Sequence, residues 1–283
     1  MIIDFHTHVF PDKMAAGTIA ELEKAAGVKA ATNGCVNGLL TSMEQAGIDC
    51  SVIMPVVTAP RQFSGINRFA HSINEAYENG DSTQTKMPQL ISFGGIHPES
   101  DDYKAQLEEL YRMGFIGIKL HPDYQGVFFD DIRYKRIVSY ASELDMIILV
   151  HAGIDIGLPK PIHCTPDMAA EVLKETQAPK LVLAHMGGWQ QWDRVEELLI
   201  GSDAYLDMAF TQSYIEETQL YRMIQNHGTD KILFATDSPW SNQKAMVEWL
   251  QGSSLPAEAK KQIFEENACR LLWKRYDKKR INK

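Results

Sequence analysis

The 283-residue sequence lacks the features of membrane-spanning, secreted and disulfide-stabilised proteins. No uninterrupted apolar run approaches the roughly 18 residues that a transmembrane helix needs. The chain opens Met1-Ile2-Ile3-Asp4-Phe5-His6, which reads as a buried strand and leaves no room for the charged and apolar segments of a secretory signal. The four cysteines are scattered and form no Cys-x-x-Cys pair. These absences predict a cytoplasmic protein with reduced thiols and no membrane partner.

An excess of positive charge is also missing. The formal net charge is -9 and the pI is about 5.5, which argues against nucleic acid or an anionic membrane as a partner. The basic segment from Lys274 to Arg280 is the exception, and a solvated, frayed terminus is its ordinary interpretation. We therefore expect a small-molecule substrate. The oligomeric state stays open, a homo-oligomer included.

Short apolar runs alternate with longer amphipathic stretches along the whole chain. Eight runs have the pattern of strands: 2–5, 51–57, 90–96, 116–121, 146–151, 181–185, 204–209 and 232–236. Most are continuously apolar, as are parallel strands that are covered on both faces. Helical patterns lie between them, for example over 103–113, 132–144 and 167–175, and two helices are expected at 15–26 and 36–47.

Strand–helix alternation with eight strands predicts an α/β fold, namely a closed (β/α)8 TIM barrel. An open doubly wound sheet is the alternative, but no Gly-x-Gly-x-x-Gly follows the first run to support it. The sequence contains no internal repeat, low-complexity segment or linker. We therefore expect one domain over residues 1–283, with closing helices at about 256–276 and with Leu271, Leu272 and Trp273 packed on the barrel.

His6 and His8 stand at the end of the first apolar run. In extended backbone, residues two apart point to the same side, so both imidazoles should meet at one point. Solvated loop histidines are the alternative, because a His-x-His pair alone is not specific for a metal.

Other polar residues follow later apolar runs in the same way. His121, His151, His185 and Asp237 each stand at the carboxyl end of a different run. A core histidine bound to a backbone carbonyl explains one such position, but it does not explain the repeated pattern. Because the carboxyl ends of barrel strands converge on one rim, the sequence predicts a metal centre there.

Taken in order, these motifs resemble the amidohydrolase superfamily, and within it the branch of aminocarboxymuconate-semialdehyde decarboxylase-like proteins. The resemblance covers nearly the whole chain. The segments that carry it are Asp4-Phe5-His6-Thr7-His8, Gly117-Ile118-Lys119-Leu120-His121-Pro122, Val150-His151-Ala152-Gly153, Leu183-Ala184-His185-Met186-Gly187-Gly188, Ala235-Thr236-Asp237-Ser238-Pro239-Trp240 and 264–272.

The resemblance implies roles for the residues in these motifs. His6, His8, His151 and Asp237 would bind a divalent metal, with Zn2+ preferred and one ion favoured over two. His185 would be the outer-sphere base that activates metal-bound water, with a ligand of a second metal as the alternative. Asp237 would act both as a ligand and as a proton shuttle, so Asp237 and His185 are the expected catalytic residues.

Lys119 shares a strand face with His121. In some binuclear relatives a carbamylated lysine on this strand bridges two metals, and in mononuclear relatives a lysine binds a substrate carboxylate or supports the ligands. A lysine that only neutralises nearby acids is the simpler alternative. Lys119, His121 and His163 are therefore expected to bind substrate or to lie beside the ligands, although a structural role for His163 fits equally well.

The expected function is metal-assisted hydrolysis of a small amide, lactone or related carbonyl compound. The alternative is non-oxidative, metal-dependent decarboxylation of a small unsaturated or aromatic acid. Ala152-Gly153-Ile154 after His151 departs from the His-Pro-Trp-like residues of those decarboxylases, which favours hydrolysis. A catalytically silent barrel is a third hypothesis, and the complete set of expected ligands argues against it. TatD-like deoxyribonucleases would have a glutamate in place of Lys119, which counts against a nuclease.

Overall fold

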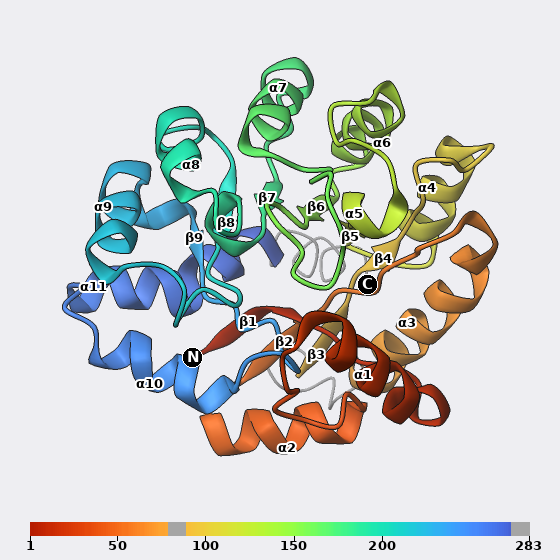
Figure 1. Ribbon diagram of the computed structural model, residues 1–283. Helices are drawn as coiled ribbons and strands as arrows, with labels where there is room; N and C mark the ends of the chain where they lie inside the picture. Colours follow the sequence, from red (N-terminus) through yellow and green to blue (C-terminus); the bar gives the residue numbers. More distant parts are fainter. Residues whose placement is uncertain (79–88, 273–283) are drawn as a thin grey trace, which may run out of the picture.

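Parallel strands form a closed ring inside a layer of helices (Figure 1). The computed structural model describes residues 1–78 and 89–272. One sheet contains β1 (Ile3–Thr7), β2 (Cys50–Ile53) and β3 (Leu90–Ser92), in that order. The second contains β4 (Gly94–Gly95), β5 (Gly117–Leu120), β6 (Ile147–Val150), β7 (Leu181–Leu183), β8 (Tyr205–Asp207) and β9 (Ile232–Leu233). Every pairing is parallel.

The two sheets join at both edges to make a barrel. Only Phe93 separates β3 from β4, so the nine strands of the described residues correspond to eight barrel strands. At the other edge, the Phe5 N–H donates to the Phe234 carbonyl (2.9 Å) and the Asp237 N–H donates to the His6 carbonyl (2.8 Å). The predicted (β/α)8 barrel is confirmed, and the open doubly wound sheet is wrong because its first and last strands would not pair.

Helices follow the strands and cover the outside of the ring. They are α1 (Asp12–Ala26), α2 (Val36–Ala46), α3 (Phe63–Glu78), α4 (Tyr103–Arg112), α5 (Pro122–Gln125), α6 (Ile132–Glu143), α7 (Pro166–Thr176), α8 (Trp192–Leu198), α9 (Glu217–His227), α10 (Gln243–Gly252) and α11 (Ala257–Lys261). The sequence explains where several helices begin. The side chains of Asp102, Thr165 and Asn242 accept backbone N–H groups in the first turns of α4, α7 and α10. No described helix has both the length and the apolar character that crossing a membrane requires.

The apolar core has two parts, as a barrel requires. An outer part between strands and helices includes Ile148 and Leu183, and an inner part inside the ring includes Phe5 and Leu149. Since neighbouring strand residues point to opposite faces, the continuously apolar runs fill both parts.

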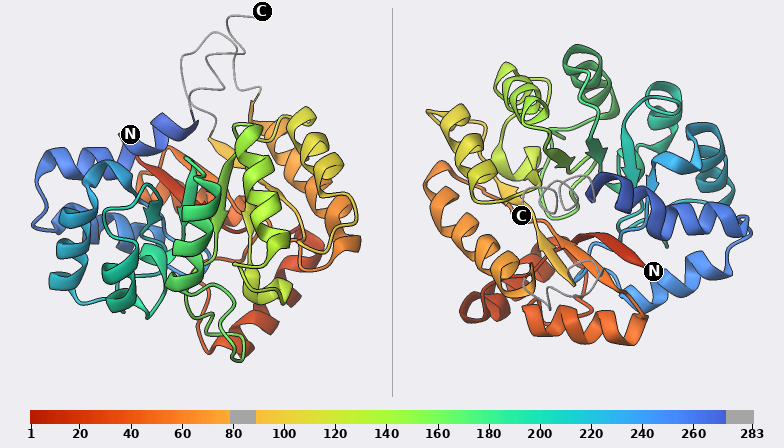
Figure 2. Two further views of the ribbon diagram at one scale, coloured as in Figure 1. Left: turned by 90° about the horizontal axis from the view of Figure 1, so that it is seen from above. Right: turned by 180° about the vertical axis from the view of Figure 1, so that it is seen from behind.

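The closing helical segment, residues 257–272, covers the amino-terminal end of the barrel. Figure 2 shows it at the end where the chain begins, while α1 and the loop after β6 lie at the opposite end. Leu271 and Leu272 are buried in the inner cluster with Ile3, as expected. Residues 273–283 lie outside the described residues. They include Trp273, whose packing was predicted, the last residues of the predicted closing helices and the basic segment from Lys274 to Arg280.

We expect the inner core to tolerate truncation poorly. Ile147→Ala removes a side chain that is 1% exposed and should lower the free energy of unfolding by about 2–5 kcal/mol. Ile132→Ala, at a site that is 56% exposed, is the matched control and should change it by less than about 0.5 kcal/mol. Denaturant unfolding measures both, and equal losses would contradict this description of the core.

Candidate metal centre

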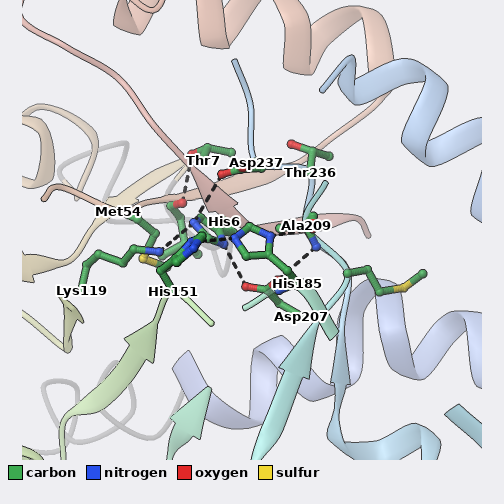
Figure 3. A network of polar contacts seen from close by, with 12 residues as sticks. His6, Thr7, Met54, Lys119, His151, His185, Asp207, Ala209, Thr236 and Asp237 are labelled. Carbon is green, nitrogen blue, oxygen red and sulfur yellow. Dashed lines mark hydrogen bonds and ion pairs between the residues drawn. The ribbon is translucent and has the colours of Figure 1, made fainter. Parts of the chain in front are cut away.

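His6 and His8 meet at the carboxyl end of β1, as predicted, with their Nε2 atoms 3.1 Å apart. Figure 3 shows His6 together with Lys119, His185 and Asp237 at this end of the strands. A register shift between Asp4 and Thr7 contributes to this arrangement. Phe5 packs in the inner core, and the shift brings the next residue, His6, to the inside as well. Asp237 completes the group: its Oδ1 lies 3.1 Å from His8 Nε2 and 3.5 Å from His6 Nε2.

The other nitrogen of each imidazole is held by an acceptor. His6 Nδ1 lies 2.9 Å from Asp207 Oδ2, and His8 Nδ1 lies 2.8 Å from the Met54 carbonyl oxygen. A neutral imidazole carries one N–H, so acceptors at Nδ1 place that proton on Nδ1 and leave a lone pair on Nε2. Burial, followed by the nearby Lys119 charge, lowers the pKa of His6 well below its usual value, which keeps this ring neutral.

Two nitrogen lone pairs and a carboxylate oxygen thus converge on one point. Ligand atoms around a tetrahedral Zn2+ are about 3.3 Å apart, given bonds of about 2.0–2.1 Å. The three separations of 3.1, 3.1 and 3.5 Å fit this spacing. These donors therefore fit a divalent cation.

Lys119 reaches the same point from β5. Its side chain is buried, and Nζ lies 3.0 Å from His6 Nε2, where the amine donates to the imidazole lone pair. Burial lowers the pKa of Lys119 to about 8, although the carboxylates of Asp237, Asp207 and Asp155 act in the opposite direction. Lys119 is thus in direct contact with a predicted metal ligand.

His151 and His185 form a second pair beside this group. His185 Nδ1 lies 2.8 Å from the Ala209 carbonyl oxygen, so it carries the proton and leaves a lone pair on Nε2. That atom lies 3.1 Å from His151 Nδ1, which must then be the donor. His151 Nε2 is consequently left with a lone pair, and it is buried without a hydrogen-bond partner among the described residues. Burial also lowers the pKa of His151 well below its usual value.

The structure does not place all four predicted ligands in one tight group. Possible ligand atoms of His6, His8 and Asp237 lie within 4.8 Å of one another. A second group within the same limit contains His151 with His121 and Asp155. His151 is therefore linked to the first group through His185, whose ring centre lies 5.5 Å from that of His6.

His121 presents a hydrogen-bond donor to this second group. Its ring stacks on His151 at 4.2 Å, and its Nδ1 accepts the Tyr124 backbone N–H at 3.4 Å. The proton of the neutral ring then lies on Nε2, which faces Asp155 Oδ2 at 3.4 Å. In this tautomer both ring nitrogens of His121 are engaged, Nδ1 as an acceptor and Nε2 as a donor.

His163 is tied to a different partner. Its Nδ1 lies 3.1 Å from Asp123 Oδ1, and its ring stacks on Phe128 at 4.8 Å. Arg61 and Arg68, which follow β2 in the sequence, are both exposed. None of these contacts joins the histidine cluster.

Two buried carboxylates at the centre were not assigned roles from the sequence. Asp207 contacts the ring of His6, and Asp4 accepts the backbone N–H groups of His6 (3.3 Å) and Thr236 (2.9 Å) and the side-chain amide of Gln243 (2.7 Å). Asp207 had a signal in the sequence, because it is a charged residue inside the apolar run 204–209, and it ends β8 at the same rim as the other polar residues. The role of Asp4 depends on contacts across the closed ring and had no such signal.

The sequence profile of a family described as amidohydrolase matches residues 3–273. The chain belongs to the amidohydrolase family. The family membership that the sequence motifs predicted is thereby confirmed, and the protein is an enzyme of the amidohydrolase superfamily. No curated protein sequence matches it at a significant level.

Solved structures of similar fold include several decarboxylases. The amidohydrolase shares 13% identity and a TM-score of 0.68 with 5-carboxyvanillate decarboxylase from Sphingomonas paucimobilis, over 96% of this chain and 98% of that one. It shares 18% identity and a TM-score of 0.68 with 2,6-dihydroxybenzoate decarboxylase from Rhizobium, over 95% and 98%. A third similar structure is a dihydroxybenzoic acid decarboxylase from Polaromonas sp. JS666, solved with manganese and 2-nitroresorcinol. It shares 16% identity and a TM-score of 0.66 with this chain, over 95% of this chain and 96% of that one.

These comparisons correct one expectation from the sequence. Hydrolysis of an amide or lactone was preferred, but the similar structures of named activity are mostly decarboxylases. The hydrolytic assignment is therefore wrong, and the departure after His151 was too weak a signal for it. The reason is physical, because the same metal-binding residues can serve either reaction.

We expect the cluster to couple metal binding to stability. Mn2+ or Zn2+ added to chelator-treated protein at one hundred times Kd should stabilise it by about 2.7 kcal/mol, a rise in Tm of about 5–10 °C. His8→Ala removes one of the converging lone pairs and should abolish most of this rise. His71→Ala, on α3, is the control and should keep it. A rise that survives in the His8 variant would show that the ion binds elsewhere.

Proposed function

We propose that this amidohydrolase catalyses the non-oxidative, metal-dependent decarboxylation of a small unsaturated or aromatic carboxylic acid. The main support is the group formed by His6, His8 and Asp237 at the rim of the barrel, with Lys119 in contact with it. The barrel itself is similar to those of several decarboxylases. Decarboxylation needs groups that hold a carboxylate and a proton donor for the carbon that loses it. The described residues around the cluster offer both.

The proposed metal ligands are His6, His8 and Asp237, with His151 as the fourth. The family and the manganese in the Polaromonas decarboxylase support a divalent metal. We propose one ion, and Zn2+ is the preferred identity because imidazole and carboxylate are among its usual ligands. When bound, such an ion supplies positive charge that holds and polarises substrate oxygen atoms.

Lys119 is the proposed partner of the substrate carboxylate. It is a cationic side chain in contact with the cluster, and its burial strengthens an ion pair with an incoming anion. His121 and Asp155 lie beside His151 in the second group. In this proposal they supply a hydrogen-bond donor and an acceptor for other substituents of the substrate.

His185 is the proposed proton carrier, with Asp237 beside it. The bond between the substrate carbon and its carboxylate breaks, and the electron pair stays on that carbon. The carbon then takes a proton delivered through His185, so one carboxylate and one proton become one C–H bond and CO2. The Ala209 carbonyl fixes the ring of His185, which keeps Nε2 directed at the cluster.

The other expectations stand as predictions. They are a single domain over residues 1–283, a small-molecule substrate rather than nucleic acid or membrane, a cytoplasmic location, and an oligomeric state that includes a homo-oligomer. For His163, a role in binding substrate or in supporting the ligands likewise remains a prediction.

The reaction can be tested with the acids named in the similar structures. Metal-loaded protein incubated in D2O with 2,6-dihydroxybenzoate or 5-carboxyvanillate should release CO2 and add one deuterium at the carbon that lost the carboxylate. Mass spectrometry and CO2 detection measure this. Amides and lactones serve as the comparison. Turnover of those compounds without CO2 release from any acid in a wider aromatic and unsaturated panel would overturn the proposal.

The role of His185 can be tested separately. His185→Gln should lower kcat by about 100- to 10,000-fold, because it removes the proton carrier. The bound metal, measured by metal analysis, should stay near one equivalent. Loss of the metal together with activity would assign His185 to coordination instead.

A further inference from the structure

Asp207 connects two histidines of the cluster, His6 of β1 and His185, which follows β7. It ends β8, its side chain is fully buried, and Oδ2 lies 2.9 Å from His6 Nδ1. Its other oxygen, Oδ1, accepts the backbone N–H groups of His185 (2.9 Å) and Ala209 (3.0 Å). Both carboxylate oxygens are therefore used, and each serves a different part of the site.

The contact with His6 decides which nitrogen of that ring carries the proton. A carboxylate accepts only, so it keeps the proton on Nδ1 and leaves the Nε2 lone pair facing His8 and Asp237. The opposite tautomer would place an N–H at the point where the ligands converge. It would also leave the carboxylate facing a nitrogen lone pair.

The contacts at Oδ1 act on His185 in a second way. His185 has a positive φ of 58°, and its N–H is held by Asp207. The same oxygen holds the Ala209 N–H, and the Ala209 carbonyl accepts from His185 Nδ1 at 2.8 Å. Asp207 thus orients the backbone group that fixes the proton of His185, and His185 in turn fixes that of His151.

We propose that Asp207 is a positioning residue that selects the Nδ1–H tautomer of His6 directly and of His185 through Ala209. One buried carboxylate thereby directs the lone pairs of the cluster toward the site. The metal-binding consequence rests on the proposed function, but the tautomers can be observed in metal-free protein. Failure of the decarboxylase assignment would leave that observation unchanged.

Asp207→Asn is the informative variant because it keeps the size of the side chain and offers only one acceptor oxygen. Two backbone N–H groups meet at the Oδ1 position, so the amide oxygen should stay there and the NH2 group should face His6. His6 Nδ1 would then have to accept, and its proton would move to Nε2.

The tautomers can be read from long-range 1H–15N correlations of protein labelled with 15N-histidine, after metal removal with a chelator. The full chain has nine histidines, and His6 is assigned by its absence in His6→Asn. In the natural protein His6 should carry its proton on Nδ1, and in Asp207→Asn on Nε2. The affinity for Zn2+, measured by chelator competition, should fall by about 10- to 100-fold.

Asp4→Asn is the matched control, because Asp4 is equally buried and contacts His6 at the backbone rather than at the ring. It should leave the proton of His6 on Nδ1. The proposal is overturned if His6 carries its proton on Nε2 in the natural protein, a measurement that needs no variant to fold. It is also overturned if Asp207→Asn leaves the tautomer of His6 and the Zn2+ affinity unchanged.

Discussion

The site depends on the pairing between the first and the last strands of the barrel. The Asp237 N–H donates to the His6 carbonyl, so a bond of the closed ring joins two proposed ligands more than two hundred residues apart. Asp4 adds to this closure, since its buried carboxylate holds backbone groups of both His6 and Thr236. Without this pairing, Asp237 would have no fixed position relative to the two histidines of β1.

Burial gives the cluster its chemical character. Removing the imidazoles from water lowers the pKa values of His6 and His151, so these rings remain neutral and keep a lone pair for an electrophile. Acceptors behind His6, His8 and His185 decide which nitrogen holds that lone pair. Converging lone pairs repel one another unless a positive group lies between them. Lys119 contributes one such group, and a metal ion would contribute a stronger one.

The sequence predicted the barrel and much of the rim, because both depend on local patterns. Apolar runs show where strands end, and parallel strands place those ends together, which is why His6, His8, Lys119 and Asp237 meet. The role of Asp207 depends on side-chain contacts between β8 and β1, which no local pattern contains. The reaction could not be predicted from the ligands either, because the same residues can bind a cation for hydrolysis or for decarboxylation.

The most direct test of the account is a crystal structure of the metal-loaded protein with anomalous scattering measured at the absorption edge of the metal. The account predicts one strong anomalous peak, from an ion coordinated by His6 Nε2, His8 Nε2, Asp237 and His151 Nε2. A peak between His121 and Asp155, or no peak near the paired histidines of β1, would contradict it.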